Sequence, residues 1–252
     1  MHISRRETVN SYIQSKGQVT IKELEKMFPE VSTMTIRRDL VQREHDGFIV
    51  RVRGGAKSID SLTNIREDAY SSRLTENIEG KTIIAKKAVK YVETGRAIYM
   101  DSGTTTMCLA NTLPDDKFSI FTSGPNIALE ILKHHKPSVT ILGGQINRDN
   151  VSVSGISALN YIKNINIDIA IMATSGFSLE NGFTAGSFSD CELKRAAMGK
   201  ANKTIMLMDT VKIGKDMPFT FATLEDIDVL ICDEELPNEV KTAADKYGVE
   251  LV

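Results

Sequence analysis

The sequence lacks any long apolar run, since no stretch of about 18 apolar residues occurs in it. We therefore expect no segment that spans a bilayer. The first residues, Met1 to Arg6, have neither an apolar core nor the small-residue cleavage site of a secretory signal. We accordingly expect a cytoplasmic protein.

Cysteine and histidine are also scarce. The three cysteines, Cys108, Cys191 and Cys232, are isolated, and no two of them have the spacing of metal ligands. The four histidines form no His-x-x-x-His pattern either. We expect the cysteines to be small buried or half-buried apolar residues in a reducing compartment, and we predict no metal and no cofactor.

The charge of the chain is unevenly distributed. Its 252 residues are 41% hydrophobic and 25% charged, as in an ordinary globular protein, and the net charge is −2. Residues 1–58 hold eleven Lys and Arg against seven Asp and Glu, a charge of +4 that leaves −6 for the rest. A basic head on an acidic body suits a nucleic-acid partner for the head alone.

Residues 1–58 are predicted to form a winged helix-turn-helix domain. Thr20 and Glu23 have the spacing of a capping box, and Ser32 is a suitable N-cap for the helix that follows it. In chain order we expect a helix over 3–15, a helix from Thr20 to Phe28-Pro29-Glu30, a helix over 33–44, and strands over 49–53 and 56–59 joined by Gly54-Gly55.

The third of these helices has the composition of a DNA-recognition helix. Such a helix reads base edges with short polar side chains in its first turn, while neighbouring cations neutralise phosphates. Asp39 can hold an arginine in place, and arginines on the wing suit backbone or minor-groove contacts. The predicted DNA-binding residues are Ser32, Thr33, Thr35, Arg37, Arg38, Arg51 and Arg53.

Beyond residue 78 strand and helix patterns alternate, which predicts a doubly wound, mostly parallel α/β domain over 78–252. Residues 59–77 are polar and are assigned to a linker with room for a short helix. Strands are expected at 97–101, 118–122, 138–142, 168–173, 204–209, 228–232 and 249–252. Helices are expected at 81–93, 104–113, 125–134, 155–163, 189–201 and 237–247.

Polar turns follow several of the predicted strands, where ligands gather in doubly wound sheets. The stretch Asp101–Thr106 combines a glycine turn with hydroxyl groups at a helix start, which favours an anion site. Ordinary N-capping is the simpler interpretation of such a turn taken alone. The predicted effector-binding residues are Asp101, Ser102, Gly103, Thr104, Thr105, Thr106, Ser123, Asn126, Gly144, Ser175, Lys194 and Lys212.

Both halves of the sequence resemble the DeoR family of bacterial regulators. Val31–Leu40 matches the family's recognition helix almost residue for residue, and Asp101–Thr105 and Asp209-x-x-Lys212 match its sensor domain. The resemblance implies a fold similar to ribose-5-phosphate isomerases and glucosamine-6-phosphate deaminases and an effector that is a phosphorylated sugar. It also implies that Lys194 and Lys212 line the effector site, and that a homo-oligomer, a dimer or tetramer, binds a double-stranded DNA operator.

Catalysis is the alternative function, because the fold is shared with enzymes. Sugar isomerisation needs a general base, usually a carboxylate. The turn at 173–177 contains no carboxylate where the isomerases carry acidic residues, and Lys194 stands near the position of their glutamate. The acids that remain for catalysis are Asp101, Asp190 and Glu192. We therefore expect a transcriptional regulator of a carbohydrate operon, with repression relieved by the sugar as the expected sense and activation as the other. A second domain that only oligomerises, and binds no ligand, is a third interpretation.

Overall fold

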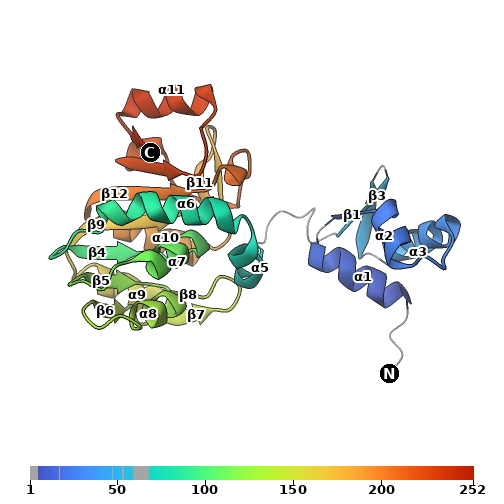
Figure 1. Cartoon of the computed structure of the whole chain (residues 1–252), viewed down its shortest axis with the longest axis horizontal. Helices are drawn as coiled ribbons and strands as arrows, with labels where there is room; N and C mark the ends of the chain where they lie inside the picture. The colour runs from blue at the N-terminus through green and yellow to red at the C-terminus, as the bar shows by residue number, and fades with distance from the viewer. Residues whose placement is uncertain (1–4, 17, 47, 53, 59–67) are drawn as a thin grey trace. The chain divides into compact units, whose positions relative to one another are not determined.

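The computed structural model describes residues 5–16, 18–46, 48–52, 54–58 and 68–252. The chain divides into two compact units, residues 1–66 and 67–252 (Figure 1). None of the helices in the described ranges combines the length and the apolar character that a bilayer span requires.

The first unit is a winged helix-turn-helix, as predicted. It contains α1 (Arg5–Lys16), β1 (Gln18–Thr20), α2 (Ile21–Met27), α3 (Thr33–His45), β2 (Ile49–Val52) and β3 (Gly55–Ser58) (Figure 1). The sequence pattern does not predict β1, which pairs antiparallel with β3 and completes a sheet in the order β1-β3-β2. These elements share a core of Val9, Ile13, Val19, Leu24, Ile36, Leu40, Ile49 and Ala56.

Local sequence signals define where the helices of this unit begin. The backbone N–H of Glu23 donates to Thr20 Oγ1 over 3.2 Å, and that of Thr20 donates to Glu23 Oε2 over 2.7 Å. This is the predicted capping box at the start of α2. Ser32 caps α3 by accepting the N–H of Thr35 over 3.3 Å. A cap of this kind contributes about 1 kcal/mol.

The two glycines of the wing turn have different roles. Gly54 has a φ of +85°, a conformation that side chains with a Cβ rarely adopt. Gly55 lies so close to β1 that a Cβ atom there would be 2.0 Å from the carbonyl oxygen of Val19. The pair therefore permits both the tight turn and the pairing of β1 with β3.

The second unit is built on a parallel sheet with the strand order β15-β14-β12-β9-β4-β5-β6. All seven of these strands overlap strands expected from the sequence. They are β4 (Ala97–Met100), β5 (Ser119–Thr122), β6 (Ser138–Ile141), β9 (Ile167–Ala173), β12 (Ala201–Met208), β14 (Val229–Cys232) and β15 (Glu250–Leu251).

Helices cover both faces of this sheet, as expected for a doubly wound fold (Figure 1). One face carries α6 (Ile78–Ala88), α7 (Thr104–Thr112) and α8 (Pro125–Ile131), and the other carries α9 (Ile156–Ile162), α10 (Phe188–Met198) and α11 (Asn238–Tyr247). Successive residues of a strand point to opposite faces. In β9, Ile169 and Ile171 accordingly belong to one core, and Ala170 and Met172 to the other.

Short antiparallel strands flank the parallel sheet, and the sequence pattern does not predict them. Polar residues or glycine interrupt the few apolar residues of these strands, so they form no continuous apolar run. Phe177 and Phe183, with ring centroids 4.7 Å apart, belong to the core of the α9–α11 face. The strands are β10 (Gly176–Ser178), β11 (Gly182–Ala185) and β13 (Phe219–Ala222) in one sheet, and β7 (Gln145–Asn147) and β8 (Ser152–Ser154) in a hairpin. Single 3₁₀ turns are η1 (Val89–Tyr91), η2 (Thr210–Lys212) and η3 (Leu224–Asp226).

A short helix, α5 (Tyr70–Thr75), lies within the stretch 59–77 that the sequence pattern assigns to a linker. Tyr70 is buried, its backbone N–H donates to the carbonyl of Asp149 over 2.8 Å, and its hydroxyl accepts from Asn126. Arg73 is buried as well. Residues 68–77 therefore pack within the second unit. Two buried side chains, three residues apart, are too few to form a recognisable apolar stripe.

Candidate ligand pocket and nucleic-acid interface

A polar pocket lies where β4 and β9 end and α7 begins. Side chains from α5, α10 and η2 complete its walls. This is the carboxyl edge of the parallel sheet, where ligands bind in doubly wound folds. The pocket is lined by Arg73, Asp101, Ser102, Gly103, Thr104, Thr105, Asn150, Ala173, Thr174, Ser175, Asp190, Lys194 and Lys212.

The turn from β4 into α7 exposes backbone donors to the pocket. The N-cap of α7 is Gly103, which has no side chain to accept the N–H groups of the first turn. A Cβ atom on Gly103 would lie 2.6 Å from that of Ala173, so glycine is what lets this turn approach the end of β9. Thr104 and Thr105 follow in the first turn. Uncapped N–H groups and the positive end of the helix dipole together favour an anion.

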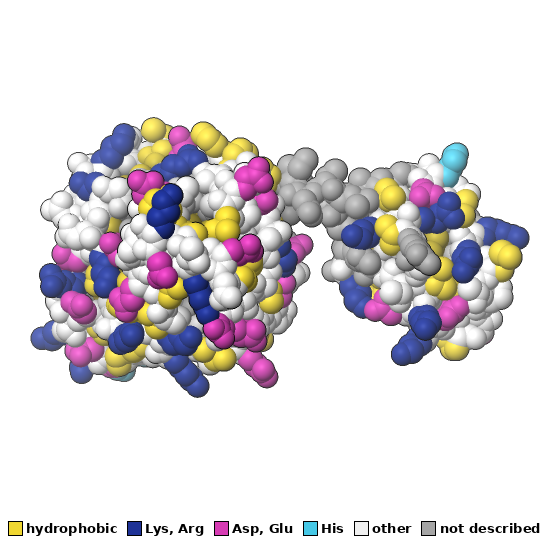
Figure 2. Space-filling view, turned by 90° about the horizontal axis from the view of Figure 1, so that it is seen from above, with side chains coloured by type: hydrophobic (Ala, Val, Ile, Leu, Met, Phe, Trp, Pro, Cys, Tyr) yellow, Lys and Arg dark blue, Asp and Glu magenta, His cyan; other side chains and the backbone are white. Residues whose placement is uncertain are grey.

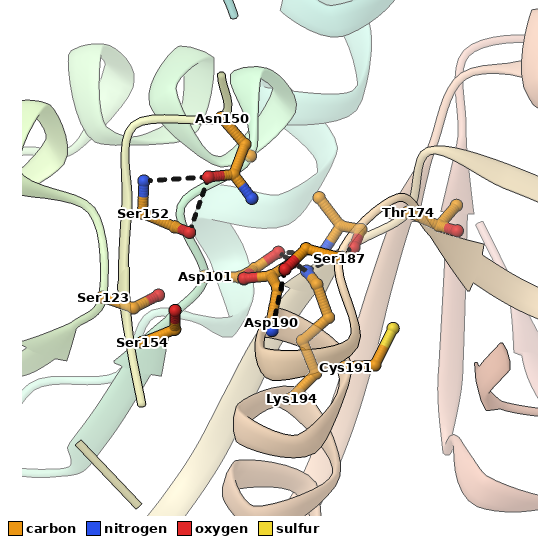
Figure 3. Close-up of polar contacts among 12 residues, drawn as sticks. Asp101, Ser123, Asn150, Ser152, Ser154, Thr174, Ser187, Asp190, Cys191 and Lys194 are labelled. Carbon is orange, nitrogen blue, oxygen red and sulfur yellow. Dashed lines mark hydrogen bonds and ion pairs between the residues drawn. The ribbon is translucent and has the colours of Figure 1, made fainter. Parts of the chain in front are cut away.

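A buried ion pair also lines the pocket. Lys194 Nζ donates to Asp101 Oδ2 and to the carbonyl oxygen of Ala173, the latter over 3.0 Å, and it lies 3.8 Å from Asp190 Oδ2. The side chains of Lys194, Asp101 and Asp190 are 5%, 1% and 6% exposed. Figure 3 shows the lysine reaching from α10 toward the two carboxylates. Removing one partner of such a buried pair typically destabilises a protein by about 3–5 kcal/mol.

One oxygen of this ion pair has no hydrogen-bond donor among the described residues. Asp101 Oδ2 accepts from Lys194 and from the backbone N–H of Ala173, the latter over 3.2 Å. Asp101 Oδ1 is buried and accepts no hydrogen bond from any described residue. A buried acceptor without a donor costs about 1–3 kcal/mol. A ligand hydroxyl that donates to Asp101 Oδ1 would recover this cost.

Lys212 brings a further positive charge to the pocket, and other charged groups lie near it. Its Nζ lies 3.3 Å from Glu76 Oε2. Burial would raise the pKa of Glu76, but Lys212 and Lys215 outweigh this effect and hold the pKa below its usual value. Burial raises the pKa of Asp209, and it lowers the pKa of Lys81. Lys212, Lys81 and Asp209 are therefore buried charges, whereas the side chain of Glu76 is 40% exposed.

The structure brings most of the predicted effector-binding residues to this one pocket. They are Asp101, Ser102, Gly103, Thr104, Thr105, Ser175, Lys194 and Lys212. These residues are separated by up to 111 positions in the chain. They meet because parallel strands place their carboxyl ends at the same edge of the sheet.

Four of the predicted residues do not line the pocket, because their polar groups serve the fold. The Thr106 hydroxyl donates to the carbonyl oxygens of Asp101 and Gly103, both over 2.7 Å. Ser123 Oγ accepts from the Tyr99 hydroxyl over 3.0 Å. The remaining two are Asn126, which donates to Tyr70, and Gly144, where a Cβ would lie 2.5 Å from the carbonyl of Ser154.

Sequence reasoning missed Arg73 and Asn150, and it did not select Thr174 or Asp190 for the site. Arg73 lies in the stretch expected to be a linker, where no local signal indicates a ligand contact. Asn150 Oδ1 accepts from the backbone N–H and the hydroxyl of Ser152, over 3.3 and 2.7 Å, which orients the side chain at the pocket wall (Figure 3).

The predicted DNA-reading residues of α3 lie on its outer surface. Ile36 and Leu40 are buried in the core of the first unit, whereas Arg37 and Arg38 are exposed. Asp39 is buried and accepts from Arg5 Nε over 2.8 Å, so it does hold an arginine, one that belongs to α1. Ser32, Thr33 and Thr35 lie at the start of the helix, and the exposed Met34 (69%) lies among them.

Two of the predicted DNA contacts have carboxylate partners. Arg51, on the wing, donates through its backbone N–H and its Nε to Glu44 at the end of α3, over 2.9 and 2.6 Å. These contacts hold the pKa of Glu44 below its usual value. Thr33 Oγ1 donates to Glu25 Oε1 over 2.5 Å. Arg51 is still 47% exposed, and Arg53 lies outside the described residues.

Comparison with known proteins matches both units. Residues 5–62 match the model of the DeoR-like helix-turn-helix domain, and residues 76–234 match that of the DeoR C terminal sensor domain. The chain is 33% identical to the HTH-type transcriptional regulator GolR of Listeria innocua, over 92% of this chain and 91% of that one. It is 32% identical to the HTH-type transcriptional regulator GlpR of Haloferax volcanii, over 88% and 86%.

Among solved structures, the chain is similar to a ribose 5-phosphate isomerase from Methanocaldococcus jannaschii. The TM-score is 0.41 at 16% identity, and the match covers 55% of each chain.

Proposed function

The chain belongs to the DeoR family of transcriptional regulators, and on this premise we propose that its second unit binds a phosphorylated sugar that controls DNA binding by the first. A regulator of this kind acts on the chromosome, in the cytoplasm. The observation that carries the proposal is one pocket in which the open start of α7 meets cations and a buried carboxylate with a free oxygen.

The two ends of such a ligand match two sides of the pocket. The phosphate suits the N–H groups and hydroxyls of Ser102 to Thr105, together with Lys212 and Arg73. The hydroxyls of the sugar suit Asp101 Oδ1 and Asn150 on the other side. Lys194 is neutralised by Asp101 and Asp190, so it orients the carboxylates and contributes less charge to the phosphate.

The relatives are named as transcriptional regulators, and we propose that this chain does not catalyse isomerisation. An isomerase needs a carboxylate or similar base that is free to take a proton from the sugar. The turn at 173–177 contains no carboxylate, and Asp101 is held in place by Lys194 and Ala173 through one oxygen, which supports a binding role. Steady turnover of ribose 5-phosphate or glucosamine 6-phosphate by the purified protein would overturn this assignment.

On the DNA side, we propose that two or more copies associate through their second units and place their α3 helices in successive major grooves. Paired half-sites are how helix-turn-helix proteins gain affinity. The sugar phosphate then favours an arrangement that no longer fits the operator, which requires that it bind the two arrangements with different affinity. Repression relieved by the ligand is the proposed sense. A monomer at all concentrations in analytical ultracentrifugation would contradict this mechanism.

The direct test is a fluorescence-anisotropy titration of the protein on DNA from upstream of its own gene, repeated with a panel of sugar phosphates. The expected result is specific binding that one sugar phosphate weakens. A thermal-shift screen of the same panel tests the interpretation that the second unit only oligomerises. Any ligand that binds the native state raises the melting temperature, whereas a pure oligomerisation domain shows no shift with any compound.

A further inference from the structure

Arg73 belongs both to the pocket and to α5. It lines the pocket, and its Nε donates to the carbonyl oxygen of Asp68 over 2.9 Å. Its guanidinium also lies 5.8 Å from the ring of Tyr70. Arginine carries five N–H donors in a planar fork, so one edge can bind an anion while Nε binds a carbonyl. Arg73 therefore joins whatever occupies the pocket to the beginning of α5.

The contact between Arg73 and a ligand matters because α5 follows the segment that connects the two units in sequence. In sequence, residues 59–67 connect β3 of the first unit to Asp68, and α5 is the first helix that the structure describes in the second unit. Figure 1 shows α5 at the edge of the second unit, beyond one end of α6. A change in how α5 packs is thus a change at the point where the connection to the DNA-binding unit begins.

The end of α5 is held by a buried lysine. Lys81 is 1% exposed, and its Nζ donates to the carbonyl oxygens of Arg73 and Glu76, the latter over 2.6 Å. An ammonium group at carbonyl oxygens that close a helix interacts favourably with them. Lys81 lies on α6, which packs on the main sheet. It therefore attaches the end of α5 to the rigid part of the unit.

A second connection between α5 and the pocket runs through Glu76, the C-cap of α5. Its carboxylate lies 3.3 Å from Nζ of Lys212 and 3.7 Å from Nζ of Lys215. Lys212 also lines the pocket. A phosphate bound there competes with Glu76 for Lys212 and repels the Glu76 carboxylate, since both groups are negative. The same ligand thus attracts one residue of this segment, Arg73, and displaces another.

We propose that α5 transmits the occupancy of the pocket: a phosphate-bearing ligand draws Arg73 toward itself, takes Lys212 from Glu76, and so rearranges the packing of residues 68–77. This inference rests on the proposed function in one respect, which is that the pocket must bind such an anion. It goes further because it assigns the response to α5, to the contact between Arg73 and the ligand, and to the ion pair between Glu76 and Lys212.

Hydrogen exchange of the full chain tests this inference, with inorganic phosphate, ribose 5-phosphate and glucosamine 6-phosphate as probes. The amides of 102–106 report binding at the start of α7, and those of 70–77 report α5. We expect at least one probe to slow exchange at 102–106 and to change it severalfold at 70–77. A variant of the exposed Arg96, Arg96→Gln, is the matched control and should respond as the wild type does.

Two variants separate the contacts. Arg73→Lys keeps the charge but loses the planar fork, so it should bind the probe severalfold more weakly and lose the change at 70–77. Glu76→Gln leaves Lys212 free for the ligand, so it should bind the probe more tightly and exchange faster at 70–77 without ligand. Because the side chain of Glu76 is partly exposed, we expect this variant to fold as the wild type does.

The outcomes distinguish this inference from the proposed function. Slower exchange at 102–106 with no change at 70–77 would show that the pocket binds the anion. It would also show that α5 does not respond to the occupancy of the pocket. No change in either segment with any probe would overturn both proposals. If Glu76→Gln binds the probe as tightly as the wild type does, and if its amides at 70–77 exchange at the same rate, the phosphate does not compete with Glu76 for Lys212.

Discussion

The two units of this protein use positive charge in opposite ways. In the first unit Arg37 and Arg38 are exposed on the outer surface of α3, whereas in the second unit Lys194 and Lys212 are buried against carboxylates. Figure 2 shows Lys and Arg side chains on the surface of both units, so surface colour alone does not reveal this difference. The buried cations are found only through their contacts.

The difference corresponds to the partners that we assign to the units. An exposed guanidinium keeps its hydration and its freedom, contributes little to folding, and binds a polyanion in a salt-dependent manner. A buried ammonium is held in one place by its partners, so it can distinguish a small ligand, but the fold depends on it. Removing charge should therefore impair binding in the first unit and stability in the second.

The largest expected effect is on stability in the second unit. Lys194→Met leaves Asp101 and Asp190 without their shared cation and should destabilise this unit by about 3–5 kcal/mol. Urea unfolding followed by circular dichroism measures the change, with Lys163→Met, at an exposed position of the same unit, as the control. An unfolding midpoint equal to that of the control would mean that the buried ion pair has no structural role.

The second-largest expected effect is a loss of affinity for the effector after a substitution at the start of α7. Thr104→Asp places a negative charge among the first-turn N–H groups, where it repels phosphate. We expect the affinity for the effector to fall about 100-fold, or roughly 2.7 kcal/mol, while DNA binding without effector is retained. Anisotropy titrations with and without the sugar phosphate measure both. An unchanged response to the effector would place the ligand elsewhere.

A smaller effect is expected for the exposed cations of the first unit. Arg38→Ala should weaken DNA binding about tenfold and, if it removes one phosphate contact, should reduce the log–log salt slope by about 0.9. The melting temperature should not change, because Arg38 is exposed. Loss of both DNA binding and thermal stability would indicate that Arg38 supports the fold, and the contrast between the units would then fail.

The smallest effect concerns pH and the capping box of α2. The hydrogen bonds from Lys16 and from Thr20 lower the pKa of Glu23 to about 2. Because this pKa lies below the usual value of 4.5, the stabilisation is present above 4.5 and is lost as the pH falls toward 2. Glu23→Gln should remove this part of the acid sensitivity of the first unit. Thermal melts of both proteins between about pH 5 and pH 2 provide the test.

The same comparison separates what could be predicted from what could not. Ser32 and Thr20 were predictable as caps, because a cap acts on backbone groups two or three residues away. Central strands such as β9, β12 and β14 were predictable because burial on both faces makes them largely apolar. The antiparallel strands β10, β11 and β13 were not, since glycine, serine or threonine interrupts their few apolar residues and leaves no continuous apolar run.

By itself, the sequence determined the elements and the chemistry available at their ends: a recognition helix with its caps, a parallel sheet, and polar turns after its strands. The helices, their caps, the apolar strands and the polar turns are visible as patterns of neighbouring residues, whereas the order of the strands in the sheet depends on pairing between distant segments. The tertiary structure alone decided that Thr106 and Asn126 turn away from the pocket and that Arg73 joins it. Those choices depend on contacts between distant segments, whose geometry arises only when the chain has packed.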